Sequence, residues 1–405
     1  MHRWLVAACV LIILCVINFF LLNSKNIQNN NSATRYIPKD NAVILNKVTS
    51  RSNFSTPNQL ANTKDLTGTL QLAENYFNQL RLTGDSRYVS YIQLLLNPWL
   101  KSSSVDHNIV LLQALVYQYQ HEFAKSLEQF DRALQLNSED VRTYYYRAYV
   151  YLAMGKPKLA YADCIRSFQL SVLLTISCTS LAESRMGFAQ KASEKLFLAL
   201  QKIEAQTNSS QELGEAFFTL AQIEFQRGQF QSADKNFQQA LIYQPNNISI
   251  LTAYTDLLLH TQKHTAAKAI LDKAPTHSYL KVRLAITTQH LERNKNLFNF
   301  WKKSKSNVLE KELDEHFTLQ NILDDKPLGR DYILYLIEIK KLYDKALTAA
   351  LKNWTIHQEP EDAYLVLKSA QLSQAPKKSK PVMEWVQKSA LEDSRIDDLV
   401  SKLSI

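Results

Sequence analysis

The sequence predicts an all-α protein, a right-handed α-solenoid of helical hairpins behind a single N-terminal transmembrane helix. Three observations predict this fold. Leu, Ala, Gln, Lys and Glu dominate the composition, and these residues lose little entropy on entering a helix. Only 7 of the 405 residues are Gly, which argues against the tight phosphate loops of Rossmann and P-loop enzymes and against barrel enzymes. Small and large apolar residues also recur with a period of about 34 residues.

The predicted transmembrane helix is the apolar run from Trp4 to Leu22, which only Asn18 interrupts. As a helix it rises about 28 Å, close to the hydrocarbon thickness of a bilayer. A cleaved signal peptide would have a shorter apolar core and a cleavage site of small residues. We therefore expect an uncleaved signal anchor over residues 1–22, with cleavage as the alternative.

The basic residues that flank this run are nearly balanced, so they do not fix its orientation. Short N-terminal tails usually stay in the cytoplasm, and on this basis the main domain is expected outside the cytoplasm, in the periplasm of a bacterial source. Residues 23–68 are rich in Asn, Ser and Thr and show no helical apolar period. This composition predicts a flexible tether.

The best repeat begins at Gly214. It places large residues at the offsets where two antiparallel helices must fill the space between them, and small residues at the offsets where the helices must approach closely. Those residues are Phe217, Leu220, Ala221, Phe230, Ala233, Phe237 and Ala240, followed by the helix breaker Pro245. Such hairpins bury their apolar faces only by stacking on neighbours.

Repeats in the same register begin at His107, Val141 and Ile248. Clear repeats are therefore expected near 107–140, 141–172, 214–247 and 248–275, within an array over residues 69–275. The stretch between the second and third fits a looser hairpin with Gly187 in its turn. Residues 276–405 are expected to form divergent helical repeats, including hairpins over 331–354 and 361–391.

The register and several local motifs carry a family resemblance. The motifs are Thr83-Gly84-Asp85-Ser86-Arg87-Tyr88 leading to Asn97-Pro98-Trp99, Asn353-Trp354 followed by Gln358-Glu359-Pro360-Glu361-Asp362-Ala363, and the ending Ala390-Leu391-Glu392-Asp393. The chain resembles the tetratricopeptide-repeat superfamily and, over about residues 70–400, a family of bacterial membrane-anchored repeat proteins. Ser90-Tyr91 departs from the Gly-Tyr of that family, which leaves the expected fold unaffected. The resemblance implies architecture and anchoring but no reaction.

A peptide-binding groove is expected on the concave side, which the first helix of each hairpin lines. Its predicted residues are Leu111, Leu115, Tyr119, Arg142, Tyr145, Tyr149, Phe218, Gln222 and Phe225. A surface so rich in aromatic and aliphatic side chains would grip an extended or helical peptide. The alternative is that these side chains pack against one another or against a terminal helix. The Lys and Asn of the clamp for a peptide's C-terminal carboxylate are absent from the matching positions.

The folded part contains two cysteines, Cys164 and Cys178, on helices expected to be neighbours; Cys9 and Cys15 lie in the apolar run. A disulfide between Cys164 and Cys178 would fit an oxidising compartment. Two buried free thiols fit the sequence equally well.

The sequence contains no catalytic motif of the nucleophile-elbow, zinc-protease, Walker or paired-cysteine kind. Asp314-Glu315-His316 is expected to be solvated, because adjacent helical residues point about 100° apart. His260 and His264 can share a helix face but lack a third ligand. The sequence therefore predicts no enzyme, no cofactor, no metal site and no small-molecule substrate.

The expected function is a membrane-anchored scaffold that binds a protein or peptide partner in the groove, in the assembly or maintenance of an envelope complex. One alternative is an envelope enzyme with an unrecognised site in residues 276–405. Another is binding of anionic lipid or nucleic acid through the basic segment 277–311, although its charge is followed at once by acids, so nucleic acid is not the expected partner.

Overall fold

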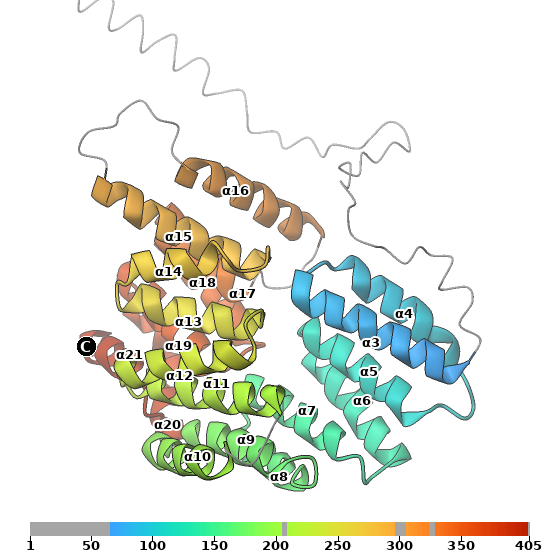
Figure 1. Cartoon of the computed structure of the whole chain (residues 1–405). Coiled ribbons are helices and arrows are strands. Elements are labelled where there is room, and N and C mark those ends of the chain that lie inside the picture. The colour runs from blue at the N-terminus through green and yellow to red at the C-terminus, as the bar shows by residue number, and fades with distance from the viewer. Residues whose placement is uncertain (1–64, 205–208, 296–304, 324–328, 404–405) are drawn as a thin grey trace, which may run out of the picture. The chain divides into compact units, whose positions relative to one another are not determined.

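The computed structural model describes residues 65–204, 209–295, 305–323 and 329–403. Up to residue 271 consecutive helices run antiparallel and stack in chain order, and the C-terminal segment returns to pack against them (Figure 1). The predicted anchor over residues 1–22 and most of the tether lie outside the described residues. Within them, no helix has the length and apolar character needed to cross a bilayer. The predicted tether extends slightly too far, because α3 already begins at Leu66.

The described helices form hairpins, each made of two neighbouring helices. The pairs of the array are α3 (Leu66–Thr83) with α4 (Arg87–Leu100), α5 (His107–Tyr119) with α6 (Phe123–Leu136), α7 (Val141–Ala153) with α8 (Pro157–Arg166), α9 (Val172–Ser184) with α10 (Ala189–Ile203), α11 (Ser210–Gln226) with α12 (Phe230–Tyr243), and α13 (Ile248–His260) with α14 (His264–Leu271). The C-terminal elements are α15 (Ser278–Lys295), α16 (Lys305–Leu323), α17 (Gly329–Leu334), the π-helix η1 (Tyr335–Lys340), α18 (Tyr343–Trp354), α19 (Pro360–Leu372), the 3-10 helix η2 (Pro376–Ser379), α20 (Lys380–Ser389) and α21 (Ser394–Leu403).

Polar side chains start the first helix of each repeat. Asp106 accepts from the backbone N–H of Asn108, and Asp140 caps α7 in the same way one repeat later. Asn247 caps α13 by accepting from two backbone N–H groups. These caps satisfy amide donors that a helix N-terminus otherwise leaves without a partner. The helices at His107, Val141 and Ile248 therefore begin where the register places them, whereas α11 begins at Ser210, ahead of the predicted repeat start at Gly214.

The turns inside the hairpins also follow the register. Gly155 and Gly228 have φ of 66° and 76°, and His121 and Gln262 occupy the matching turns of the other clear repeats with φ of 58°. Only glycine adopts this left-handed conformation without steric cost. The repeat therefore imposes the conformation even where the residue is not glycine.

Small residues let the paired helices approach, as predicted. Ala221, Ala233 and Ala240 are fully buried, and so are Ala114 and Ala133 in the first clear repeat. The packing forms a series of apolar clusters along the chain, of which the largest in the array joins α9 to α14 around Phe237.

A disulfide joins Cys164 on α8 to Cys178 on α9, with the two Cα atoms 5.6 Å apart. Both cysteines are fully buried beside Ala160 and Ala182. The bridge therefore links the last helix of one hairpin to the first helix of the next.

Reduction of the Cys164–Cys178 disulfide is expected to destabilise the folded chain by about 2–3 kcal/mol, because it frees a short loop in the unfolded state. Urea unfolding with and without dithiothreitol measures the change, and hydrogen exchange should locate it to α8 and α9. A variant with Cys164→Ser and Cys178→Ser should unfold at one midpoint in both conditions. An unchanged midpoint for the wild-type chain would contradict a structural bridge.

Candidate binding surface

Two tyrosines on α7 and a glutamate on α11 form a hydrogen-bonded cluster on the predicted groove. Tyr145 and Tyr149 lie four residues apart and so share one face of the helix. The Tyr149 hydroxyl donates to Glu215 Oε1 at 2.8 Å, and the Tyr145 and Tyr149 hydroxyl oxygens are 3.1 Å apart. The two rings meet edge to face with centroids 5.2 Å apart. We call these three residues the Tyr-Glu cluster.

The Tyr-Glu cluster is half-buried and carries an acidic group without a contacting cation. Burial raises the pKa of the Glu215 carboxyl, while the hydrogen bond from Tyr149 lowers it. Burial also raises the pKa of both tyrosines well above its usual value, and the nearby Glu215 adds to this effect. Among the described residues no Lys or Arg forms an ion pair with Glu215, and Arg81 acts on it only from a longer range. The cluster thus offers two aromatic rings and one carboxylate to a positively charged group.

The repeat register also places Glu215 on the concave side, although the predicted groove residues do not include it. Glu215 is the second residue of the repeat that begins at Gly214, and this position lines the concave side. Tyr145 and Tyr149 are the fifth and ninth residues of the repeat that begins at Val141, which are two other positions on the concave side. The structure brings all three together because α7 and α11 both pack on α9.

The N-terminal part of the predicted groove is occupied by internal contacts. Leu111 is only 5% exposed and belongs to an apolar core cluster, so it is a core residue. Leu115 packs on the same cluster, and the Tyr119 hydroxyl lies 3.5 Å from the Leu80 carbonyl oxygen. Arg142 holds two hairpins together, since it donates to Asn108 Oδ1 at 2.6 Å and pairs with Asp140.

The C-terminal part of the predicted groove is covered by the end of the chain. Phe225 is 7% exposed, and the Arg395 guanidinium carbon lies 4.4 Å from its ring centroid. Phe218 packs into the core with its ring 6.2 Å from that of Phe237. Gln222 is half-buried. Phe225 therefore packs against the terminal helix α21, which is the alternative to an open groove that the sequence also allows.

The segment after α20 docks on the array through buried polar contacts. The Gln226 side-chain amide donates to the Glu392 carbonyl oxygen at 2.8 Å and to the Ser184 carbonyl oxygen at 3.0 Å. Arg185 donates to the same side chain at 3.0 Å. Gly228 leaves room for Ser394, since a Cβ atom there would lie 2.7 Å from its hydroxyl oxygen. These contacts hold the C-terminal segment on the array, and they occupy polar groups of Gln226 and Arg185 that a ligand could otherwise use.

Charged side chains in the C-terminal region are paired with one another. Arg283 is buried between Asp256 and Asp331, with contacts of 2.8 Å and 2.7 Å. Lys281 in the basic segment 277–311 pairs with Glu312. Two of the positive charges in the described part of this segment, on Lys281 and Arg283, are therefore paired with acids of the protein.

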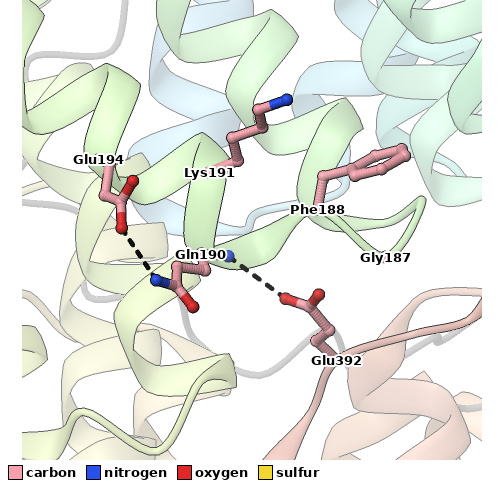
Figure 2. A pocket seen from close by; sticks show the side chains of 6 residues that line it. All are labelled: Gly187, Phe188, Gln190, Lys191, Glu194 and Glu392. Carbon is pink, nitrogen blue, oxygen red and sulfur yellow. Dashed lines mark hydrogen bonds between the residues drawn. The ribbon is translucent and has the colours of Figure 1, made fainter.

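A shallow, open pocket lies where the turn before α10 meets the C-terminal segment (Figure 2). Its acids are already bonded, because the Gln190 backbone N–H donates to Glu392 Oε2 at 3.2 Å and its side chain donates to Glu194. No nucleophile in this pocket is paired with a base. The pocket therefore marks the place where the turn before α10 contacts the C-terminal segment, and we do not assign a ligand to it.

Among the described residues, no group of three or more His, Cys, Asp and Glu side chains could hold a metal ion. His260 packs on Phe225 and Phe230, while His264 stacks on His290 with ring centroids 4.4 Å apart. Asp314 accepts hydrogen bonds from Tyr335 and Lys340. These contacts account for the histidine and acidic residues that the sequence singles out.

Residues 111–164 match the model of a tetratricopeptide repeat family. The chain is similar to a tetratricopeptide repeat protein from Parabacteroides merdae, with 13% identity over 61% of this chain and 93% of that one and a TM-score of 0.38. It is also similar to the quorum sensor NprR from B. thuringiensis, with 13% identity, coverage of 81% and 90%, and a TM-score of 0.44. Yeast Tom70 shares 15% identity, with coverage of 86% and 78% and a TM-score of 0.36. No curated protein matches the chain.

Proposed function

We propose that this chain, in which residues 111–164 match a tetratricopeptide repeat family, is a membrane-anchored scaffold that binds a cationic peptide segment of a partner protein at the Tyr-Glu cluster. The observation that carries the proposal is the half-buried Glu215 carboxylate, which bonds a tyrosine but contacts no cation among the described residues. A Lys or Arg side chain, or a peptide's terminal amine, would supply the missing charge.

The chemistry of the cluster favours such a ligand over an anionic one. A hydrogen bond between a carboxylate and an ammonium or guanidinium group is stronger than a neutral one. The faces of Tyr145 and Tyr149 attract the same cations through their ring quadrupoles. An anionic peptide would meet Glu215 and the nearby Glu212 with repulsion.

The anchor and the compartment belong to the same proposal. The apolar run from Trp4 to Leu22 is long enough to cross a bilayer as a helix. The disulfide between Cys164 and Cys178 supports an oxidising compartment for the folded part. We therefore propose a single-pass protein with its repeats in the periplasm, acting in the assembly or maintenance of an envelope complex.

Cross-linking in native membranes, followed by mass spectrometry, identifies the partner and the segment that contacts α7 and α11. A synthetic peptide of that segment then serves as the probe in fluorescence anisotropy with the full-length protein in detergent. Protease accessibility in spheroplasts measures the orientation of the repeats independently.

Glu215→Gln is expected to weaken binding of that peptide about 10-fold to 100-fold, the value of a charge-assisted hydrogen bond. The pH dependence follows from the raised pKa of Glu215: protonation on lowering the pH neutralises the carboxylate, so wild-type binding weakens toward acid. The variant should lack this weakening.

Glu194→Gln, at an exposed position on α10, is the matched control and should bind as the wild type does. Replacing the Lys or Arg of the probe by norleucine should cost wild-type binding but have little effect on Glu215→Gln. Equal binding by the wild type and Glu215→Gln at neutral pH would exclude the Tyr-Glu cluster as the binding site.

A further inference from the structure

A surface of α8 and the following loop exposes apolar side chains that no helix in the described part of the chain covers. Leu159 and Ile165 on α8 are 49% and 51% exposed, and Phe168 in the loop is 58% exposed. Leu170 and Val172 are exposed immediately after it. We call these five residues the α8 patch. An apolar concentration of this kind marks an interaction surface, whereas single exposed side chains are ordinary.

The spacing places the patch on one side of α8. Leu159, Ala162 and Ile165 follow each other at intervals of three residues and are all exposed, so they lie along one stripe of the helix. Their opposite face carries Ala160 and Cys164, which are fully buried. The stripe therefore points away from the helices that pack on α8.

The loop that carries Phe168 is held in place. Its backbone N–H donates to the Ile165 carbonyl oxygen at 3.2 Å, and the Leu170 N–H donates to the Ser167 carbonyl oxygen at 2.9 Å. The Cys164–Cys178 disulfide fixes the helix end from which the loop leaves. Since the loop is preorganised, exposing Phe168 is a stable property of the fold.

The exposed charges on α8 beside the patch are positive, whereas the Glu212 carboxylate reaches the far end of the patch and accepts a hydrogen bond from Ser171, between Leu170 and Val172. Lys156, Lys158 and Arg166 are exposed, and Asp163 is the single acid between Lys156 and Val172. Asp163 is buried and pairs with Arg147 at 2.7 Å. Arg166 stacks its guanidinium group on the Tyr144 ring, 5.2 Å from the centroid, which keeps its charge beside the patch. An occupant of this surface thus meets exposed apolar groups with positive charges along α8 and one carboxylate at the opposite end.

We propose that the α8 patch docks on an anionic phospholipid surface, with Phe168 and its apolar neighbours inserted at the headgroup level. Apolar side chains flanked by Lys and Arg are the pattern of interfacial membrane contact, in which burial and attraction to anionic lipid act together. A protein partner is a poorer match, because the cores of protein interfaces are depleted in Lys. The docking surface consists of other residues than the Tyr-Glu cluster, so it adds a second contact to the proposed scaffold.

Site-specific photocross-linking of the full-length protein tests this proposal. p-Benzoylphenylalanine replaces Phe168, and the protein is reconstituted into vesicles of phosphatidylcholine alone or of phosphatidylcholine with phosphatidylglycerol. Mass spectrometry then measures lipid adducts at residue 168. We expect adducts several-fold more abundant in the anionic vesicles, and their loss when salt is raised or when Lys156→Glu and Lys158→Glu are combined.

The matched control places the same amino acid at Ile242 on α12, which is 67% exposed. This control corrects for an anchor that merely holds the protein near the bilayer, and circular dichroism verifies that each variant is folded. Adduct levels at 168 equal to those at 242 would overturn the proposal, and so would adducts to a second copy of the chain instead of lipid. Because peptide binding is measured in detergent, its outcome is separate from this one.

Discussion

Replacing Asp362 by alanine is expected to destabilise the C-terminal hairpins by about 3 kcal/mol, within the range for breaking a buried ion pair. The Asp362 side chain is completely buried and accepts from Arg330 at 2.7 Å and 2.6 Å. It also accepts from the Asn353 side chain at 2.8 Å and the Glu359 backbone N–H at 3.1 Å. Alanine leaves these donors without that acceptor. Because Arg330 is partly exposed and still pairs with Glu359, we expect the lower part of the range.

Hydrogen exchange of the full-length protein measures this effect where it arises. The amides of α17, α18 and α19 should lose protection in Asp362→Ala, while those of α3 and α4 should keep it, since stability in repeat proteins depends on neighbours. Tryptophan fluorescence offers a second readout, because Trp354 and Trp385 lie in the same apolar cluster. Asp344→Ala, at an exposed position in the first turn of α18, should cost less than about 1 kcal/mol. Equal losses for both variants would argue that Asp362 contributes only a helix-end charge.

The local geometry of the array could be predicted from the sequence because it repeats. The offsets that place Ala221, Ala233 and Phe237 in the core depend only on helix period and hairpin length. The same period places a left-handed residue in each turn, including His121 and Gln262, which do not look like turn residues. Local constraints of this kind need no knowledge of the rest of the chain.

The contacts between the C-terminal segment and the array could not be predicted in the same way. Gln226 bonds the backbone of Glu392, 166 positions further along the chain, and no periodicity links two residues at that separation. Arg395 covers Phe225 for the same reason, so a position that the register assigns to the groove is closed by the chain's own end. The pairing of the buried Arg283 with Asp256 and Asp331 also depends on the complete fold, because these residues are far apart in the sequence.

The candidate binding site lies between these two cases. The register indicates that Tyr145 and Tyr149 face the concave side, and it assigns Glu215 to another position on that side. It does not indicate that the carboxylate reaches the Tyr149 hydroxyl across α9. Nor does it indicate that Arg142, predicted beside them, is committed to Asp140 and Asn108. Sequence therefore predicts the face on which Tyr145, Tyr149 and Glu215 lie, although it places the core residue Leu111 on that face as well, whereas the bond partners depend on how far each hairpin rotates on the next.

Phe237→Ala is expected to be the most disruptive single substitution in the array, with a loss of about 3–5 kcal/mol. Phe237 is fully buried at the centre of the cluster that joins α9 to α14. Its ring stacks on Tyr254 with centroids 5.4 Å apart and packs against Phe218. Alanine removes these contacts and leaves a cavity between α11, α12 and α13, which small neighbouring residues such as Ala233 and Ala240 cannot fill.

The measurement is the urea midpoint together with hydrogen exchange, with Phe197→Ala as the matched control. Phe197 is 48% exposed on α10, so the same chemical change should cost it less than about 1 kcal/mol. Loss of protection should reach α11 and α13, because neither hairpin can bury its apolar face without the other, and it should fade toward α3 and α4. If Phe237→Ala instead loosened only α12, neighbouring repeats would be independent of one another, and a continuous face linking Tyr145 and Tyr149 to Glu215 would lose its physical basis.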